Sequence, residues 1–194
     1  MTVEENKKEF IELLSRVDRK GVEELVEFLN ATDFFIAPAS HRFNLAEDGG
    51  LCKHSLNVYH NLCGLAQAFD LEMNTDSLII TGLLHAIGKV NTYEKYTQNK
   101  YIDSKWVQVD GYRFKEANEK DLLLSAEPAT TSAIMISHLI KLTDEETAAI
   151  LNYQGNYMNP TTAEIYNRYP LAMLLHMADV ATLYVDENPY RLDE

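Results

Sequence analysis

Three polar residues lie in segments whose other side chains are almost all apolar. His54 lies in GLCKHSLNVY, His85 ends the run SLIITGLLH, and Asp179 is embedded in PLAMLLHMADVATLY. A buried carboxylate without a partner is costly, so Asp179 requires a metal, a cation or several hydrogen-bond donors. Two neutral imidazoles and one carboxylate form a donor set for a divalent metal. Each histidine also fits a hydrogen-bonded core residue, and spacing alone leaves both interpretations open.

The segments that carry these residues are predicted to be helices, because their apolar residues recur at helical spacing. Thr75 is the expected N-cap of a nearly all-apolar helix, and Gly88 is the expected residue that ends it. Thr143 and Glu146 have the spacing of a capping box. The expected helices cover 4–16, 21–30, 51–69, 76–87, 128–141, 143–153 and 170–185.

Two segments lack a helical pattern. Residues 30–50 have no clear period and are expected to form a long irregular loop, a kind of segment that is usually functional. Residues 91–114 are rich in aromatic and β-branched side chains around the polar stretch NKYIDS, which predicts a β-hairpin. We therefore expect an all-α fold, a compact helical bundle with one inserted hairpin at about 91–114, in a single domain over 1–194.

The charge composition of the chain limits the classes of partner that it is expected to bind. The 17 basic and 30 acidic residues give a net charge of −13, which repels the phosphates of long nucleic acids and of anionic membranes. A pocket with a locally reversed potential can still bind a small nucleotide. No window of 18 apolar residues and no apolar leader occurs, so a cytoplasmic location is predicted. Cys52 and Cys63 lie about 16 Å apart on one expected helix, too far for a disulfide.

A resemblance adds to this interpretation. The segments GGLCKHSLNVY, LLHAIGKVNTY and PLAMLLHMADVATLY resemble the three motif blocks of the HD-domain phosphohydrolase superfamily. From about residue 8 to 184, including APASHRFN and WVQV, the chain is similar to small bacterial and bacteriophage HD proteins. That family binds one or two divalent metals, which activate water against phosphate bonds of nucleotides. The resemblance implies an HD-like fold with His54, His85 and Asp179 as metal ligands. It also implies a location in the bacterial cytoplasm, or in the host cytoplasm for a phage protein.

Three positions depart from the family pattern. Ala86 stands where the family has the aspartate of its His-Asp pair, and Pro128 and Tyr153 stand at positions where histidines are expected. Ala86 alone would also fit a deliberate substitution of the catalytic aspartate. Three losses together favour a natural pseudoenzyme with little or no metal binding and no cofactor.

The remaining pocket residues are suited to an anionic nucleotide. Lys89, one turn beyond His85, is placed to contact a phosphate, and the guanidinium of Arg42 offers a planar fork. Lys89 also fits a solvated helix-end cation. Trp106 and Tyr112 also fit side chains that pack the hairpin on the helices. The candidates to stack on a base are Tyr93, Trp106, Tyr112 and Tyr153.

Three functions follow as hypotheses. The first is a binding protein that holds a nucleotide or nucleotide-derived signal without hydrolysing it, for example to sequester a messenger of a phage's host. The second is a metal-dependent phosphohydrolase with one divalent ion (Mn, Mg, Fe, Zn, Co or Ni) held by His54, His85 and Asp179. The third is an interaction module, such as a homo-oligomer that uses the acidic surface and the hairpin.

Overall fold

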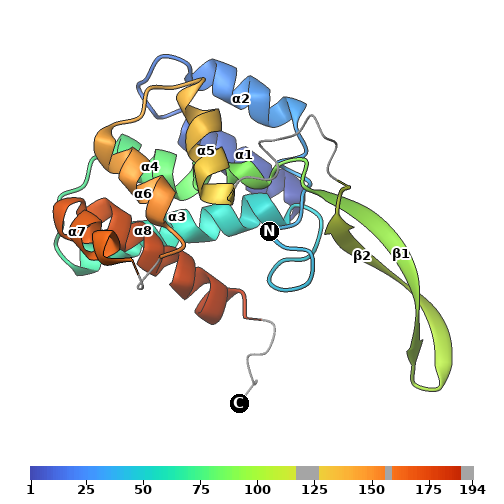
Figure 1. The fold of residues 1–194 in the computed structure, drawn as a ribbon. Helices are drawn as coiled ribbons and strands as arrows, with labels where there is room; N and C mark the ends of the chain where they lie inside the picture. Colours follow the sequence, from blue (N-terminus) through green and yellow to red (C-terminus); the bar gives the residue numbers. More distant parts are fainter. Residues whose placement is uncertain (117–126, 156–158, 189–194) are drawn as a thin grey trace.

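Helix α3 (Gly50–Ala68) forms the centre of the helical part, where it contacts α1, α4 and α8 (Figure 1). The computed structural model describes residues 1–116, 127–155 and 159–188. The elements are α1 (Val3–Leu14), α2 (Val22–Ala31), α3, α4 (Thr75–Leu84), a 3-10 turn (Ile87–Lys89), β1 (Tyr93–Ile102), β2 (Lys105–Phe114), α5 (Pro128–Ser137), α6 (Asp144–Asn152), α7 (Pro160–Arg168), α8 (Pro170–Ala181) and a π-turn (Thr182–Asp186).

The all-α expectation is wrong, because the chain is mostly helical but also forms a two-stranded antiparallel sheet. Strands β1 and β2 pair along all ten residues of each, from Tyr93 opposite Phe114 to Ile102 opposite Lys105. The hairpin is an arm that extends away from the helices, so the molecule is not a simple compact bundle (Figure 1). Only Asp103 and Ser104 form the turn, both with positive φ (49° and 64°), as a two-residue turn matched to strand twist requires.

The start and end of α4 differ from the prediction. Asn74, not Thr75, is the N-cap, since its side chain accepts a hydrogen bond from the Ser77 amide at 3.0 Å. The helix ends at Leu84, and a 3-10 turn follows. Gly88 lies within that turn rather than ending a helix. A Cβ at Gly88 would lie 2.5 Å from the Pro128 carbonyl oxygen, so close packing of α5 explains this glycine.

Two apolar clusters hold the helices together, and α3 contributes to both. One contains the ring contacts among Phe10, Phe34 and Phe35, with centroids 5.0–5.6 Å apart. The other packs α3 against α6 and α8 through residues such as Leu62 and Leu175. The elements that carry the three polar residues therefore meet along α3.

A buried ion pair joins three separate elements. Both Glu146 carboxylate oxygens lie 2.6 Å from Arg19 guanidinium nitrogens, and Ser77 donates to one of them at 2.6 Å. Glu146 also completes the predicted capping box with Thr143, which is confirmed. Burial alone would raise the pKa of Glu146, but its hydrogen bonds with Arg19 and Ser77 lower it below the ordinary value.

The sequence also predicted that the two cysteines form no disulfide with each other and that no segment spans a membrane. Cys52 and Cys63 are free thiols, as predicted, and burial raises the pKa of Cys52 to about 12. Among the helices that the structure describes, none has the length and apolar character to cross a membrane.

Candidate metal and ligand site

Histidines from two helices meet an aspartate from a third. His54 lies on α3, His85 is the C-cap of α4, and Asp179 lies on α8. The Asp179 Oδ1 atom is 3.3 Å from His54 Nε2 and 3.7 Å from His85 Nε2. All three residues are buried, and each offers one ligand atom within 4.8 Å of the others. This group, called the His-His-Asp cluster below, could hold one metal ion.

Glu187 is a fourth member of the site, and the sequence analysis missed it. Its carboxylate lies 3.0 Å from His54 Nδ1 and accepts hydrogen bonds from Asn44 at 2.8 Å and Asn57 at 2.9 Å. The π-turn after α8 brings Glu187 back toward α3, since the Glu187 amide donates to the Thr182 carbonyl. In the sequence Glu187 belongs to a polar, acidic tail, and no local pattern distinguishes it there.

His54 lies between two carboxylates, Asp179 at one ring nitrogen and Glu187 at the other. Burial lowers the pKa of His54, but the hydrogen bonds to the two carboxylates outweigh it, so the pKa is raised above the ordinary value. The two acids therefore favour the protonated ring, which can donate a hydrogen bond to each of them. When Nε2 binds a metal instead, Glu187 still holds the proton on Nδ1.

His85 is in the opposite state. Burial, and then the charge of His54, lower the pKa of His85 to about 4, so its ring is neutral at pH 7. Nδ1 lies 2.9 Å from the Gly82 carbonyl, which can only accept, so the proton is on Nδ1. Nε2 then carries a lone pair, is buried, and has no hydrogen-bond partner among the described residues. A buried acceptor of this kind is suited to a metal or a ligand donor.

The separations of the two histidine nitrogens from Asp179 Oδ1 are close to those that a metal requires, and all three ligand atoms lie within 4.8 Å of one another. With metal–ligand distances of about 2.1 Å, neighbouring ligand atoms lie roughly 3.0–3.4 Å apart. The distances of 3.3 Å and 3.7 Å to Asp179 Oδ1 need only a small adjustment. The donor set of two imidazoles and one carboxylate therefore fits a single divalent ion.

Of the three positions that depart from the HD-domain pattern, Ala86 and Tyr153 adjoin His85, and Pro128 lies against the 3-10 turn that follows it. Ala86 is fully buried in the apolar core and offers only a methyl group. Pro128 begins α5, and its carbonyl oxygen lies against Gly88 in the 3-10 turn. The Tyr153 ring lies 4.8 Å from the His85 ring, and its buried hydroxyl has no hydrogen-bond partner in the described part of the chain.

His176, one turn before Asp179, positions Tyr153. Its Nδ1 atom lies 2.7 Å from the Tyr153 carbonyl oxygen, and its ring stacks on Tyr166 with centroids 6.0 Å apart. A Cβ at Gly155, where φ is +69°, would lie 2.5 Å from the His176 ring. The backbone after Tyr153 is thus closely fitted to His176.

Lys89 lies at the cluster rather than in bulk solvent. It is half-buried, and its ammonium group donates to the Ala39 carbonyl at 3.2 Å. Burial lowers the pKa of Lys89, while the nearby charges of Asp179 and Glu187 oppose that shift. The interpretation of Lys89 as a solvated helix-end cation is therefore wrong.

The structure does not bring the other candidate residues into the cluster. Arg42 is exposed and lines a hollow of about 660 Å³ between the irregular loop and the hairpin. Tyr93 is half-buried at the base of the hairpin, against Phe114. The Tyr112 hydroxyl donates to Asp48. Trp106 lies next to the turn of the hairpin, opposite Tyr101, and the arm extends away from the helices (Figure 1). Trp106 therefore does not line the cluster and does not pack the hairpin on the helices.

Comparisons of the chain with protein-family models, with curated proteins and with solved structures found no match. Membership of the HD superfamily therefore stays a prediction, which depends on the sequence motifs around His54, His85 and Asp179.

Proposed function

We propose that this protein binds a nucleotide or nucleotide-derived signalling molecule at the His-His-Asp cluster and does not hydrolyse it. The observation that carries the proposal is Ala86, a fully buried methyl group directly beside His85. Hydrolysis of phosphate bonds by a metal-dependent enzyme requires an ion that activates water, held by enough ligands. The cluster offers three ligand atoms, with a single carboxylate among them, and Ala86, Pro128 and Tyr153 supply no further carboxylate or imidazole for a second ion.

The charges of the cluster support binding of an anion. His54, whose pKa is raised by its two carboxylate partners, and Lys89, which lies near Asp179 and Glu187, offset the negative charge of these acids within a chain of net charge −13. An incoming phosphate therefore meets less repulsion here than over most of the surface. Lys89 and His54 can donate charge-assisted hydrogen bonds to its oxygens.

A second candidate function is a phosphohydrolase with one metal. The observation that favours it is the shared orientation of the two histidines, which both direct Nε2 toward Asp179 while Nδ1 is held by Glu187 or by Gly82. A bound divalent ion would polarise a phosphate and lower the pKa of a water molecule. His54, His85 and Asp179 would hold that ion, and Lys89 would orient the phosphate.

Thermal unfolding with nucleotides and cyclic nucleotides, with and without Mn²⁺, tests both candidates. For the binding protein we expect a ligand-dependent rise in Tm, which Lys89→Ala and His54→Ala remove and the surface variant His60→Ala keeps. Chromatography should recover the ligand intact. Turnover on the order of 1 s⁻¹ with metal would contradict the proposal and support the phosphohydrolase.

The variant Ala86→Asp addresses how the metal site was lost. We expect it to gain little metal, because Pro128 and Tyr153 still supply no ligand and the new carboxylate enters a fully buried position. Metal content after dialysis against Mn²⁺, compared with the unmodified protein, measures this. One equivalent of tightly bound metal together with hydrolysis would show that Ala86 alone separates this chain from an active enzyme.

A further inference from the structure

The end of the hairpin carries an apolar, basic surface without a partner among the described residues. Here the exposed fractions are 72% for Trp106, 62% for Tyr101 and 47% for Ile102. The two rings contact each other with centroids 5.3 Å apart, and Lys100 and Lys105 flank them. Tryptophan and tyrosine exposed together are typical of binding surfaces. We call these five residues the hairpin tip; the turn between them also carries the acidic Asp103, so Lys100, Asp103 and Lys105 together give a net charge of +1.

The hairpin is anchored to the body near its base, where Lys95 and Tyr112 both donate to Asp48, and its outer part projects beyond these contacts. Its two strands pair with each other along their whole length, and the arm projects from the helices (Figure 1). A two-stranded hairpin by itself is marginally stable in water, and both of its edges offer unpaired backbone groups. A partner that covers the tip would supply the burial that the chain does not provide.

Charge identifies the kind of partner. Residues 93–114 contain four basic and three acidic side chains, a net charge of +1, whereas the whole chain has −13. The remainder of the chain therefore carries −14. A basic, aromatic tip is complementary to an acidic surface with apolar side chains, and the body of a second copy offers such a surface.

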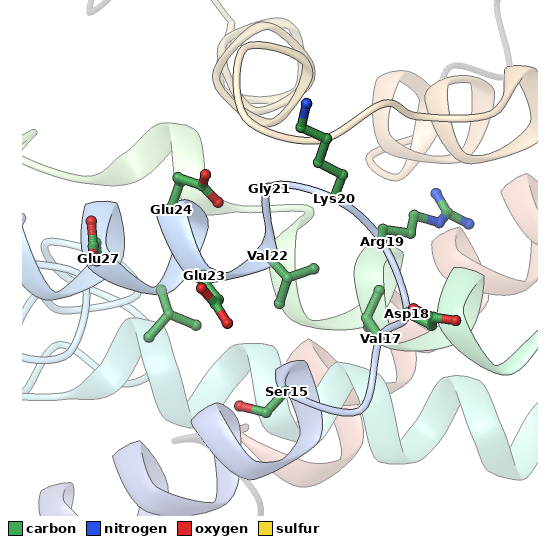
Figure 2. Close-up of a pocket in the computed structure, with 11 residues that line it drawn as sticks. Ser15, Val17, Asp18, Arg19, Lys20, Gly21, Val22, Glu23, Glu24 and Glu27 are labelled. Atoms are coloured by element: carbon green, nitrogen blue, oxygen red, sulfur yellow. The ribbon is translucent and has the colours of Figure 1, made fainter.

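A hollow at the turn between α1 and α2 matches the tip in chemistry (Figure 2). It has a volume of about 740 Å³, and none of its lining residues belongs to the His-His-Asp cluster. Arg19 also lines it but is bound to Glu146, and Lys20 points away from the acidic side chains. Four acids line the hollow, namely Asp18, Glu23, Glu24 and Glu27, and the partly buried Val26 is the accessible apolar side chain beside them, because Val17 and Val22 are buried in the core.

We infer that the hairpin tip of one copy of this chain binds the α1–α2 hollow of a second copy. Lys100 and Lys105 pair with the glutamates, and the rings of Trp106 and Tyr101 lie over Val26. Two copies related by a twofold axis make this contact twice, which closes the assembly as a dimer. The inference is independent of the function proposed for the cluster.

Sedimentation and light scattering of the full chain test the inference. We expect a mass of about twice 22.1 kDa that falls toward the monomer in 1 M salt, where the Debye length drops to about 3 Å. The variant Trp106→Ser should weaken association about 30-fold or more, as expected for a central aromatic contact. Phe69→Ser, another exposed aromatic on the body, is the matched control and should leave association unchanged. A monomeric unmodified chain at micromolar concentration would overturn the inference.

A charge-exchange experiment tests the hollow itself. Lys100→Glu/Lys105→Glu and Glu23→Lys/Glu27→Lys should each be monomeric alone, because like charges then face each other. Mixed together, the two variants should associate, since both contacts of the mixed dimer then pair opposite charges, one in the original arrangement and one in the reversed arrangement. All four positions are exposed, so the substitutions should not disturb the fold. Circular dichroism of each variant is the control for folding. Failure of the mixture to associate would show that the tip does not bind this hollow.

Discussion

Glu187 shows how a single side chain determines what its neighbour can do. Its carboxylate accepts the Nδ1 proton of His54 and is itself fixed by Asn44 and Asn57. Such a carboxylate orients an imidazole and increases its basicity. His85 lacks a carboxylate at Nδ1 and has the Gly82 carbonyl instead, so the two rings differ in charge although they face the same aspartate.

The variant Glu187→Gln should destabilise the protein by about 1.5–3 kcal/mol, because a charge-assisted hydrogen bond to His54 is lost. His54 has a raised pKa in the folded state, so its contribution to stability is complete below its ordinary value of 6.5 and is lost as pH rises. The difference from the unmodified protein should therefore shrink above pH 6.5. Urea unfolding between pH 5 and 9 measures this.

The exposed pair of His60 and Glu9, 2.9 Å apart, provides the control for that experiment. Glu9→Gln should change the unfolding free energy by less than about 1 kcal/mol, since exposed pairs contribute little. Equal effects of the two substitutions would show that Glu187 has no special role in holding His54.

Tyr153→Phe should leave the stability of the ligand-free protein unchanged or raise it by about 1 kcal/mol, because the hydroxyl is buried without a partner. Tyr166→Phe is the comparison. Its hydroxyl donates to the Asn152 carbonyl at 3.2 Å, and its loss should cost about 0.5–1.5 kcal/mol. A loss above 1 kcal/mol for Tyr153→Phe, measured by urea unfolding, would contradict this assignment.

At the scale of the elements, the sequence predicted the features that depend on local patterns and missed those that depend on contacts between distant segments. Helical periodicity placed α3 and the helix of Asp179 within a few residues, and β-branched and aromatic content located the hairpin. The exact turn at Asp103 and Ser104 was not predicted, since the polar stretch NKYIDS offers several turns. Glu187 and the true role of Gly88 depend on segments far away in the sequence, which no periodicity records.

Two glycines should respond in opposite ways to alanine. At Gly88 a Cβ would meet backbone and side-chain atoms of α5 at 2.5–2.9 Å, so Gly88→Ala should cost about 1–3 kcal/mol. At Gly64, inside α3, a Cβ meets nothing within 4 Å, so Gly64→Ala should stabilise by about 1 kcal/mol. Thermal unfolding of both variants checks this, and a neutral Gly88→Ala would show that α5 does not pack closely there.

For the whole molecule, the ion pair of Arg19 and Glu146 holds together segments that are distant in the sequence. Glu146→Gln should cost about 3–5 kcal/mol, because it leaves a partly buried guanidinium without its partner. The pKa of Glu146 is lowered in the folded state, so this stability is present above the ordinary value of 4.5 and disappears as pH falls. The exposed variant Glu12→Gln, which breaks a surface pair with Lys8, should change stability by less than about 1 kcal/mol. Acid unfolding that is the same in both variants would contradict the prediction.

The contact between His54 and Glu187 spans 133 positions of the chain, and this distance sets an order of events during biosynthesis. At about 5–20 residues per second, a ribosome needs roughly 7–27 s to proceed from one residue to the other. During that interval the α3 histidine has emerged or is emerging, while both carboxylates that hold it have yet to be translated. A nascent chain can therefore begin to bury apolar side chains early, but His54 gains both of its carboxylate partners only after translation has passed residue 187.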